Sequence, residues 1–186
     1  MNNFRFDSDR HEYWLCDKKL LSCTEILKIC GLIDDSFYTY ETAQRGKVVH
    51  YCCHYLAEGD LDWTTVDPIV ESYVRAYEKF RNDIYWRPTH CEVPMYHKSM
   101  IYGVTPDQYN DDAVLEIKSG TMQKWTAIQT ALQAMAIWPD DYMRKKRFGV
   151  ELRNDGSYGT KVFDDINDFN TAIGCVSVAN WKVKNK

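Results

Sequence analysis

Asp107, Glu116 and Lys118 are the residues of this sequence whose types and spacing are best suited to chemistry. Two carboxylates on one face of a hairpin repel each other, and a divalent cation between them converts that repulsion into binding. Mg²⁺ favours one or two carboxylates together with waters and substrate phosphate. A metal of this kind lowers the pKa of a bound water, and a neighbouring lysine can hold that water or stabilise the growing negative charge. The three residues therefore suit metal-assisted attack on a phosphodiester.

A β-hairpin is expected to bring these three side chains together. Turn formers at 110–112 separate two stretches with strand character. In the register centred on this turn, Asp107 lies directly opposite Glu116, with Cβ atoms about 4.5–5.5 Å apart. Alternate residues of a strand share a face, so the side chain of Lys118 leaves on the same side as Glu116. If the two carboxylates repel, replacing Asp107 with asparagine should stabilise the metal-free protein.

Five segments keep a fixed order around this hairpin. They are Leu-Ser-Cys-Thr-Glu-Ile-Leu at 21–27, Arg-Gly-Lys-Val-Val-His at 45–50, Gly103–Asp107, Leu115–Gly120 and Gln129. In order and spacing the sequence resembles the PD-(D/E)XK nuclease superfamily, in its RecB-like and phage exonuclease branch. The resemblance covers roughly residues 20 to 140. It departs from the usual pattern at Gln133, where the branch has tyrosine.

The resemblance implies a metal-dependent DNA nuclease, with exonuclease activity in phage-type recombination, repair or DNA processing. Asp107 and Glu116 would bind Mg²⁺ or Mn²⁺ together with the backbone carbonyl of Ile117. Lys118 would position the attacking water. His50 would be a metal ligand or contact the scissile phosphate. The alternative for His50 is an ordinary packed histidine, since a lone histidine on a helix is usually structural.

Further residues are assigned by the same resemblance. Gln129 would turn to the active site and hold a carboxylate, a water or a DNA phosphate. Arg45, Ser119, Gln133 and Lys124 are the expected substrate-binding residues. The alternative for the two glutamines is a pair of partly exposed amides.

Glu92 lies in a predicted strand where the branch often has a glutamate, and two interpretations of it stay open. It would support the metal site, or it would form a salt bridge unrelated to catalysis.

Two other functions remain compatible with the pattern. One is a non-catalytic DNA-binding or assembly protein with the same fold, and the other is an RNA nuclease. The first is disfavoured because a protein without chemistry has little reason to keep two mutually repelling carboxylates beside a lysine.

Length and composition indicate one globular domain spanning residues 1–186. The chain has 186 residues, of which 45% are hydrophobic and 14% aromatic, enough for a substantial core. No apolar run approaches a membrane span and the N-terminus lacks the form of a signal peptide, so we expect a cytoplasmic protein, in the host cytoplasm if it is phage-encoded. The expected partners are DNA and a recombination or replication protein, with no membrane partner.

Charge is not concentrated in the way typical of proteins that coat nucleic acid. The net charge is −4, and the basic clusters at 144–147 and 182–186 are interpreted as solvated faces. Seven cysteines without CxxC spacing predict free thiols. No iron–sulfur cluster is expected, because relatives with such a cluster have three cysteines near the C-terminus and this chain has only Cys175 there.

The elements needed to hold the hairpin can be placed along the chain. Short strands are expected at 4–6 and 12–15, longer strand stretches at 86–97, 148–152 and 158–163, and helices at 23–31, 40–58, 68–81, 123–138 and 166–182. Val48 and Ile69 are expected on the buried sides of the second and third helices. The fold class is α/β, with a mixed central β-sheet flanked by helices, as in the restriction-endonuclease-like core.

Overall fold

The computed structural model describes residues 3–34 and 39–185, and all structural statements below refer to these residues. Its helices are α1 (Cys23–Ile29), α2 (Tyr40–Glu58), α3 (Pro68–Asp83), α4 (Thr126–Ile137) and α5 (Asn167–Lys184). Its strands are β1 (Phe4–Asp7), β2 (Glu12–Leu15), β3 (Lys18–Ser22), β4 (His90–Cys91), β5 (Met95–Tyr96), β6 (Tyr102–Val104), β7 (Gln108–Tyr109), β8 (Ala113–Lys118), β9 (Lys146–Leu152) and β10 (Tyr158–Val162). The predicted α/β class is confirmed.

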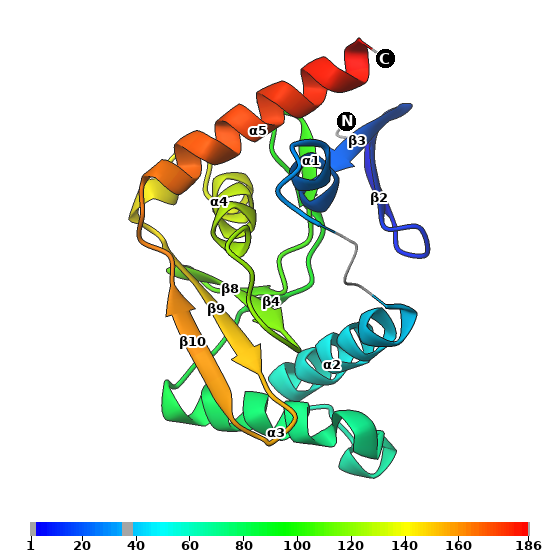
Figure 1. Cartoon of the computed structure of the whole chain (residues 1–186), viewed down its shortest axis with the longest axis vertical. Coiled ribbons are helices and arrows are strands. Elements are labelled where there is room, and N and C mark those ends of the chain that lie inside the picture. Colours follow the sequence, from blue (N-terminus) through cyan, green and yellow to red (C-terminus); the bar gives the residue numbers. More distant parts are fainter. Residues whose placement is uncertain (1–2, 35–38, 186) are drawn as a thin grey trace.

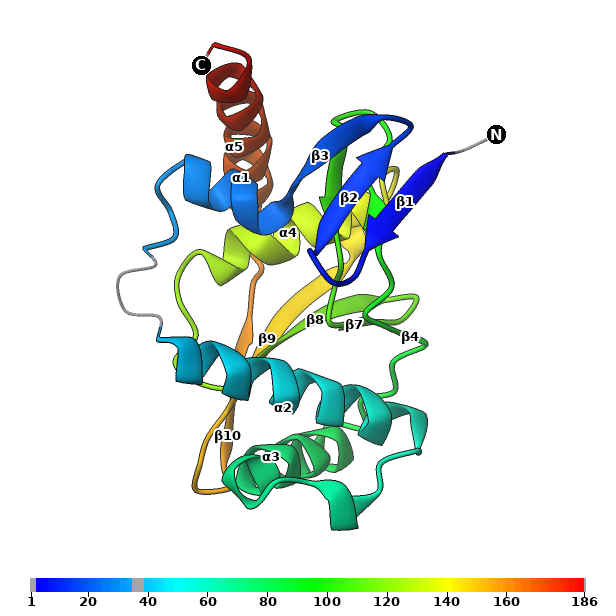
Figure 2. The same ribbon diagram turned by 90° about the vertical axis from the view of Figure 1, so that its right-hand side faces the viewer.

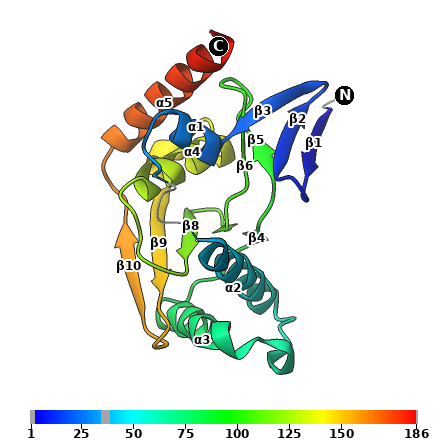
Figure 3. The same ribbon diagram turned by 45° about the vertical axis from the view of Figure 1, so that its right-hand side comes forward.

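The strands form two mixed sheets. One has the order β1-β2-β3-β6-β5 and the other β10-β9-β8-β7-β4. Only β3 with β6 and β8 with β9 pair in parallel. Figure 3 shows the two sheets side by side, with the chain crossing between them after β6. The mixed sheet expected from the sequence is thus present, with its strands divided between two sheets.

The stretch 86–97 contributes to this division. It was expected to form one strand, but it contains Pro88 and Pro94, which have no backbone N–H to donate to a ladder. It forms β4 and β5 instead, and these belong to different sheets. Glu92 between them has a positive φ of 49°, an uncommon conformation for a residue with a side chain.

Helical layers cover the second sheet at both ends of the molecule. Figures 1 and 2 show α1, α4 and α5 toward one end, α2 and α3 toward the other, and β8 to β10 between them. Each helical group has its own apolar core. Alternate residues of β8 serve the two cores: Val114 packs with the α4 side, while Ala113, Leu115 and Ile117 pack with α2 and α3. Glu116 shares the side of Val114, so its carboxylate points toward α4.

Helix α2 begins and ends where local sequence signals require it. Thr39 and Thr42 exchange hydrogen bonds in a capping box, which satisfies backbone donors of the first turn. Gly59 ends the helix with φ 86°, a left-handed conformation that suits glycine. The helix therefore runs over residues 40–58, as predicted.

Some burial predictions are wrong. Val48 and Ile69 are exposed, because α2 packs through Val49 and Cys53 and the buried stripe of α3 begins one residue later, at Val70. Arg147 belongs to the basic cluster that was interpreted as solvated, yet it is buried and its guanidinium donates to the carboxylate of Asp168 at 2.8 Å. In the described residues, none of the helices has the length and apolar character needed to span a membrane.

Candidate active site

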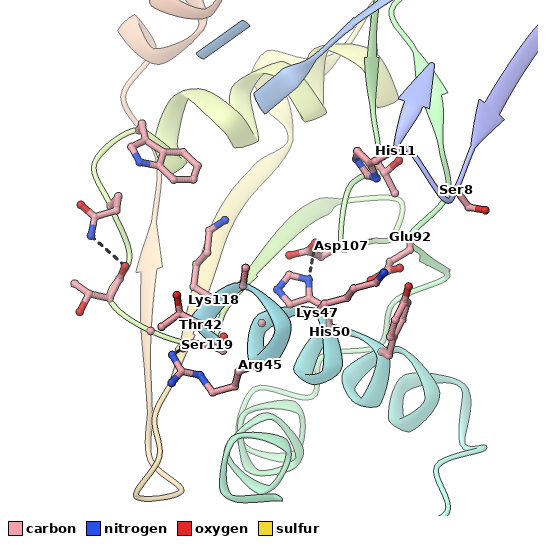
Figure 4. Close-up of a pocket in the computed structure, with 18 of the residues that line it drawn as sticks. Ser8, His11, Thr42, Arg45, Lys47, His50, Glu92, Asp107, Lys118 and Ser119 are labelled. Atoms are coloured by element: carbon pink, nitrogen blue, oxygen red, sulfur yellow. Dashed lines mark hydrogen bonds and ion pairs between the residues drawn. The ribbon is translucent and has the colours of Figure 1, made fainter. Parts of the chain in front are cut away.

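A cleft of about 1030 Å³ opens between α2, the β1–β2 turn and the loop that follows β8. Its walls come from residues 8–11, from α2 residues between 42 and 51, from Thr105 and Asp107, and from residues between 118 and 125. Figure 4 shows Asp107, His50 and Lys118 in its centre, Arg45 and Ser119 toward one side, and Ser8 and His11 toward the other. The cleft therefore gathers segments that are up to 117 residues apart, from Ser8 to Trp125.

The hairpin register agrees with the prediction. Gln108 pairs with Leu115, and continuing this antiparallel register by one residue places Asp107 opposite Glu116. Gln108 anchors this end of the hairpin, since its Oε1 accepts hydrogen bonds from Tyr77 Oη at 2.6 Å and Trp86 Nε1 at 2.8 Å. Asp107 therefore follows directly from a fixed point in the core.

Glu116 is buried, with 2% of its surface exposed, and its carboxylate is enclosed by donors. Oε1 accepts from Lys118 Nζ and from Gln129 Nε2, each at 2.7 Å, and Oε2 accepts from Gln133 Nε2 at 2.7 Å. Burial and the nearby Asp107 raise the pKa of Glu116, while Lys118 and Gln133 act in the opposite direction. A buried carboxylate needs partners of this kind because desolvation disfavours its charged form.

Asp107 has two partners of its own. Its Oδ2 accepts the backbone N–H of Ile117 at 2.6 Å, and its Oδ1 lies 3.2 Å from His50 Nδ1. Burial raises the pKa of Asp107, but His50, Lys118 and the Ile117 N–H together lower it below its ordinary value. Asp107 is therefore a carboxylate held by opposite charge rather than one left to repel Glu116. The structure therefore does not support the prediction that replacing Asp107 with asparagine stabilises the metal-free protein.

His50 reaches Asp107 from α2 and lies at the cleft, as predicted from the Arg-Gly-x-x-x-His segment (Figure 4). Burial alone would lower the pKa of His50, but the adjacent Asp107 carboxylate raises it to about 9. This shift favours the protonated ring, whose Nδ1–H can donate to Asp107. His50 is therefore placed to orient Asp107, and its role as a metal ligand, which would require a neutral imidazole, stays a prediction.

Lys118 is placed by three neighbours. Besides Glu116, its ammonium donates to Gln129 Oε1 at 3.3 Å and lies 4.9 Å from the centre of the Trp125 ring. An ammonium within about 6 Å of an indole face is attracted by the ring. Gln129 therefore bridges the lysine and the carboxylate, which gives this predicted active-site glutamine a defined position.

Arg45 and Ser119 meet at the edge of the cleft. Arg45 Nη2 donates to the backbone oxygen of Ser119 at 3.2 Å, and the guanidinium lies 5.3 Å from the centre of the Tyr73 ring. The Nε of Arg45 is buried and has no hydrogen-bond partner among the described residues. The structure thus brings both predicted substrate-binding residues to one place, with unused donor capacity on the arginine.

Two other expected substrate contacts are not supported. Gln133 is buried and donates to Glu116, so it positions a carboxylate and has no surface for a substrate. Lys124 is exposed on the loop after β8 but is not part of the cleft wall. Glu92 does line the cleft, and its backbone N–H donates to the Asp107 carbonyl at 3.0 Å. This contact is made by the backbone of Glu92, so both interpretations of its side chain stay open.

The oxygen donors suit a hard divalent cation. Asp107 and Glu116 supply two carboxylates, and Mg²⁺ characteristically uses one or two of these with waters and substrate phosphate. Within residues 3–34 and 39–185, no group of three or more His, Cys, Asp or Glu side chains is gathered so as to hold a metal by itself. The expected set of Asp107, Glu116 and His50 is therefore not assembled as a metal cage, and the Ile117 carbonyl and waters would have to complete it.

The β1–β2 turn and Trp125 were not expected at the site. His11 lines the cleft, and its Nε2 lies 3.1 Å from Tyr13 Oη, which in turn lies 2.7 Å from Thr105 Oγ1. Tyr13 can pack this closely because Gly103 has no side chain: a Cβ there would lie 2.1 Å from the Tyr13 ring. No local sequence signal links this turn to Asp107. Gly103 belongs to the Gly103–Asp107 segment, but its packing against Tyr13 is visible only in the structure.

Comparison with known proteins supports the fold. No protein-family model matches the sequence, and comparison with curated proteins found no relative. The structure is similar to an alkaline exonuclease (LHK-Exo) from Laribacter hongkongensis, with a TM-score of 0.50 and 16% identity over 89% of this chain and 88% of that one. A protein from Eubacterium rectale, provisionally named an exonuclease, aligns with a TM-score of 0.48 and 14% identity over 84% of this chain and 73% of that one. The fold expected from the sequence resemblance is thus confirmed.

Proposed function

We propose that this protein is a metal-dependent nuclease that hydrolyses phosphodiester bonds of DNA. The observation that carries the proposal is the grouping of Asp107 and Lys118 at the cleft, with the buried Glu116 held directly behind them by Lys118. Each carboxylate is oriented by dedicated partners. Buried carboxylates that must be held by several donors are costly to a fold. Binding of a cation and a phosphate by these carboxylates would explain why the fold contains them despite this cost.

In this proposal Asp107, Glu116 and the Ile117 carbonyl would hold Mg²⁺ or Mn²⁺. The cation, when bound, activates a water and offsets charge on the phosphate. Lys118 holds the attacking water, which adds to phosphorus as the bond from phosphorus to the leaving oxygen breaks. His50 keeps Asp107 oriented through its Nδ1–H.

The remaining polar groups of the cleft have supporting roles in this scheme. Gln129 and Gln133 orient Glu116, and Gln129 also fixes the distance between the carboxylate and the ammonium of Lys118. Arg45 has donors to offer to a backbone phosphate beside Ser119.

An exonuclease acting in phage-type recombination, repair or DNA processing is the specific form that we propose. Two things support it: the ordered motifs between Leu21 and Gln129, and the shared fold with the Laribacter hongkongensis protein, which is an alkaline exonuclease. A recombination or replication protein would be its partner. The activity would be located in the cytoplasm.

The test is a time course with end-labelled linear DNA and closed circular DNA of the same sequence, each with Mg²⁺, Mn²⁺ or EDTA. We expect release of label from the linear DNA with either metal, no change in the circle, and no reaction in EDTA. Lys118→Ala is the matched inactive control, and a single-stranded RNA substrate tests the RNA alternative. Cleavage of the circle would indicate an endonuclease. Absence of cleavage of every substrate, with nucleic acid still bound, would identify a non-catalytic binding protein.

A further inference from the structure

The outer face of α2 has two exposed aromatic rings in line with a lysine. Lys47, Tyr51 and Tyr55 are spaced four residues apart, so they lie one turn after another on the same face. The rings of Tyr51 and Tyr55 are 46% and 52% exposed, although tyrosine has a large apolar surface. We call these three residues the α2 stripe.

The stripe continues the wall of the candidate active site. Lys47 and Tyr51 both line the cleft that contains Asp107 and Lys118, and Tyr55 lies one turn further along the helix. Lys47 Nζ lies 5.7 Å from the centre of the Tyr51 ring. A ligand that extends from the cleft along α2 would therefore meet a cation first and then two aromatic faces in succession.

The charge of this helix favours a polyanion. Between Thr42 and Ala57 the sequence has no acidic residue and includes Arg45 and Lys47, in a protein whose net charge is −4. The next acidic residue, Glu58, is engaged by His54 Nε2 at 3.1 Å. The stripe is thus a locally cationic strip that continues the cleft.

A positive charge followed by two exposed aromatic rings suits unpaired nucleotides. Proteins that hold single strands combine a basic groove for the backbone with aromatic rings on which successive bases stack. In a duplex the base faces are stacked on one another and are not available to the two tyrosines. We propose that the α2 stripe binds the single-stranded part of a nucleic-acid substrate, with bases stacked on Tyr51 and Tyr55 and a phosphate beside Lys47.

This inference rests on the proposed nuclease function and specifies its substrate: a strand that is unpaired on one side of the bond to be cleaved. The two sides of the cleft would then bind different parts of the nucleic acid. The side with Arg45 and Ser119 offers hydrogen-bond donors to phosphate, whereas the side that leads to Tyr55 offers flat rings to bases.

The test measures binding without turnover, by fluorescence anisotropy in EDTA with a dye-labelled twenty-nucleotide oligothymidine. Tyr51→Ala and Tyr55→Ala should each weaken binding by about 5- to 150-fold, the range for loss of one stacked base. Tyr51→Phe keeps the ring and should bind like wild type. Tyr85→Ala removes a tyrosine that is 80% exposed and lies outside the cleft wall, so it is the matched control and should not change binding.

Salt and base dependence separate stacking from general charge attraction. Lys47→Ala should reduce the slope of log Kd against log salt by about 0.7, the value for one phosphate contact on a single strand. The two tyrosine variants should keep the wild-type slope. An oligonucleotide with abasic sites should bind wild type as weakly as the intact one binds the tyrosine variants, and a fully paired duplex should show no dependence on Tyr51 or Tyr55.

Several results would overturn the inference. One is equal affinity of wild type and both tyrosine-to-alanine variants for the oligothymidine. Another is a loss of affinity in the Tyr85→Ala control as large as in those variants. A third is a difference in sedimentation between wild type and the tyrosine variants, which would show that the stripe is a contact between copies of the chain. The outcomes also separate the two proposals. Tyrosine-dependent binding without cleavage in Mg²⁺ would refute the nuclease function and support single-strand binding by the α2 stripe. Cleavage with tyrosine-independent binding would support the nuclease function and refute single-strand binding by the α2 stripe.

Discussion

Replacing Asp107 with asparagine tests how the candidate site is held together before any metal binds. The Asp107 carboxylate accepts the Ile117 N–H and is paired with His50, and both interactions favour its charged form. Loss of a hydrogen bond to a charged group costs about 1.5–3 kcal/mol. Relief of the repulsion from Glu116 across the hairpin returns at most about 1 kcal/mol. The loss outweighs the gain, so we expect the metal-free variant to be less stable by about 0.5–3 kcal/mol.

A thermal melt in EDTA measures this difference. For a chain of this size, 1 kcal/mol corresponds to about 2–4 °C, so the melting temperature at pH 7 should fall by about 1–12 °C. Asp111→Asn changes an exposed aspartate in the hairpin turn and should stay within about 0.5 kcal/mol of wild type. In a double-mutant cycle, His50→Gln should add little further loss once Asp107 has been replaced.

The pH dependence identifies the interaction. The pKa of His50 is raised from 6.5 to about 9, mainly by the Asp107 carboxylate acting against burial. A raised pKa contributes stability that is fully present below pH 6.5 and is lost as the pH rises through about 9. The difference between wild type and Asp107→Asn should therefore be largest at pH 6–7 and smaller at pH 10, where only the Ile117 N–H interaction remains. A higher melting temperature for the variant at pH 7, or a difference that does not change with pH, would refute this account.

Four other outcomes are expected. Lys118→Ala should slow cleavage by about 10²–10³-fold and also lower the melting temperature, because buried Glu116 loses its ammonium partner; single-turnover rates and melts on one preparation check both. Gln133→Leu should weaken Mg²⁺ binding by about 10–100-fold in calorimetry, since Glu116 loses an orienting donor; unchanged affinity would contradict that role. Titration with Mg²⁺ should raise the wild-type melting temperature by mass action, and a flat titration would argue against a metal site. Arg147→Met should lower the free energy of unfolding in urea by about 3–5 kcal/mol by leaving Asp168 unpaired, with the specific activity of the folded fraction retained.

The local parts of this site are predictable from the sequence because local interactions determine them. The turn at 110–112 sets the hairpin register, and the register alone places Asp107 opposite Glu116. The capping box at Thr39 and the left-handed Gly59 delimit α2, so the position of His50 on a helix also follows from sequence. The order of the motifs was enough to indicate the fold.

Partners and burial depend on contacts between distant segments, and only the tertiary structure decides them. His50 and Asp107 are 57 residues apart, and their contact turns an expected repulsion at Asp107 into an ion pair. Burial of Glu116 against α4 makes Gln133 a support for a carboxylate rather than a substrate contact. A hydrophobicity pattern shows which face of a strand or helix is apolar, but not which polar group it will meet there. The pKa of each site residue depends on its contacts with these polar groups. The chemistry of the cleft therefore depends on how the two sheets and their helices pack.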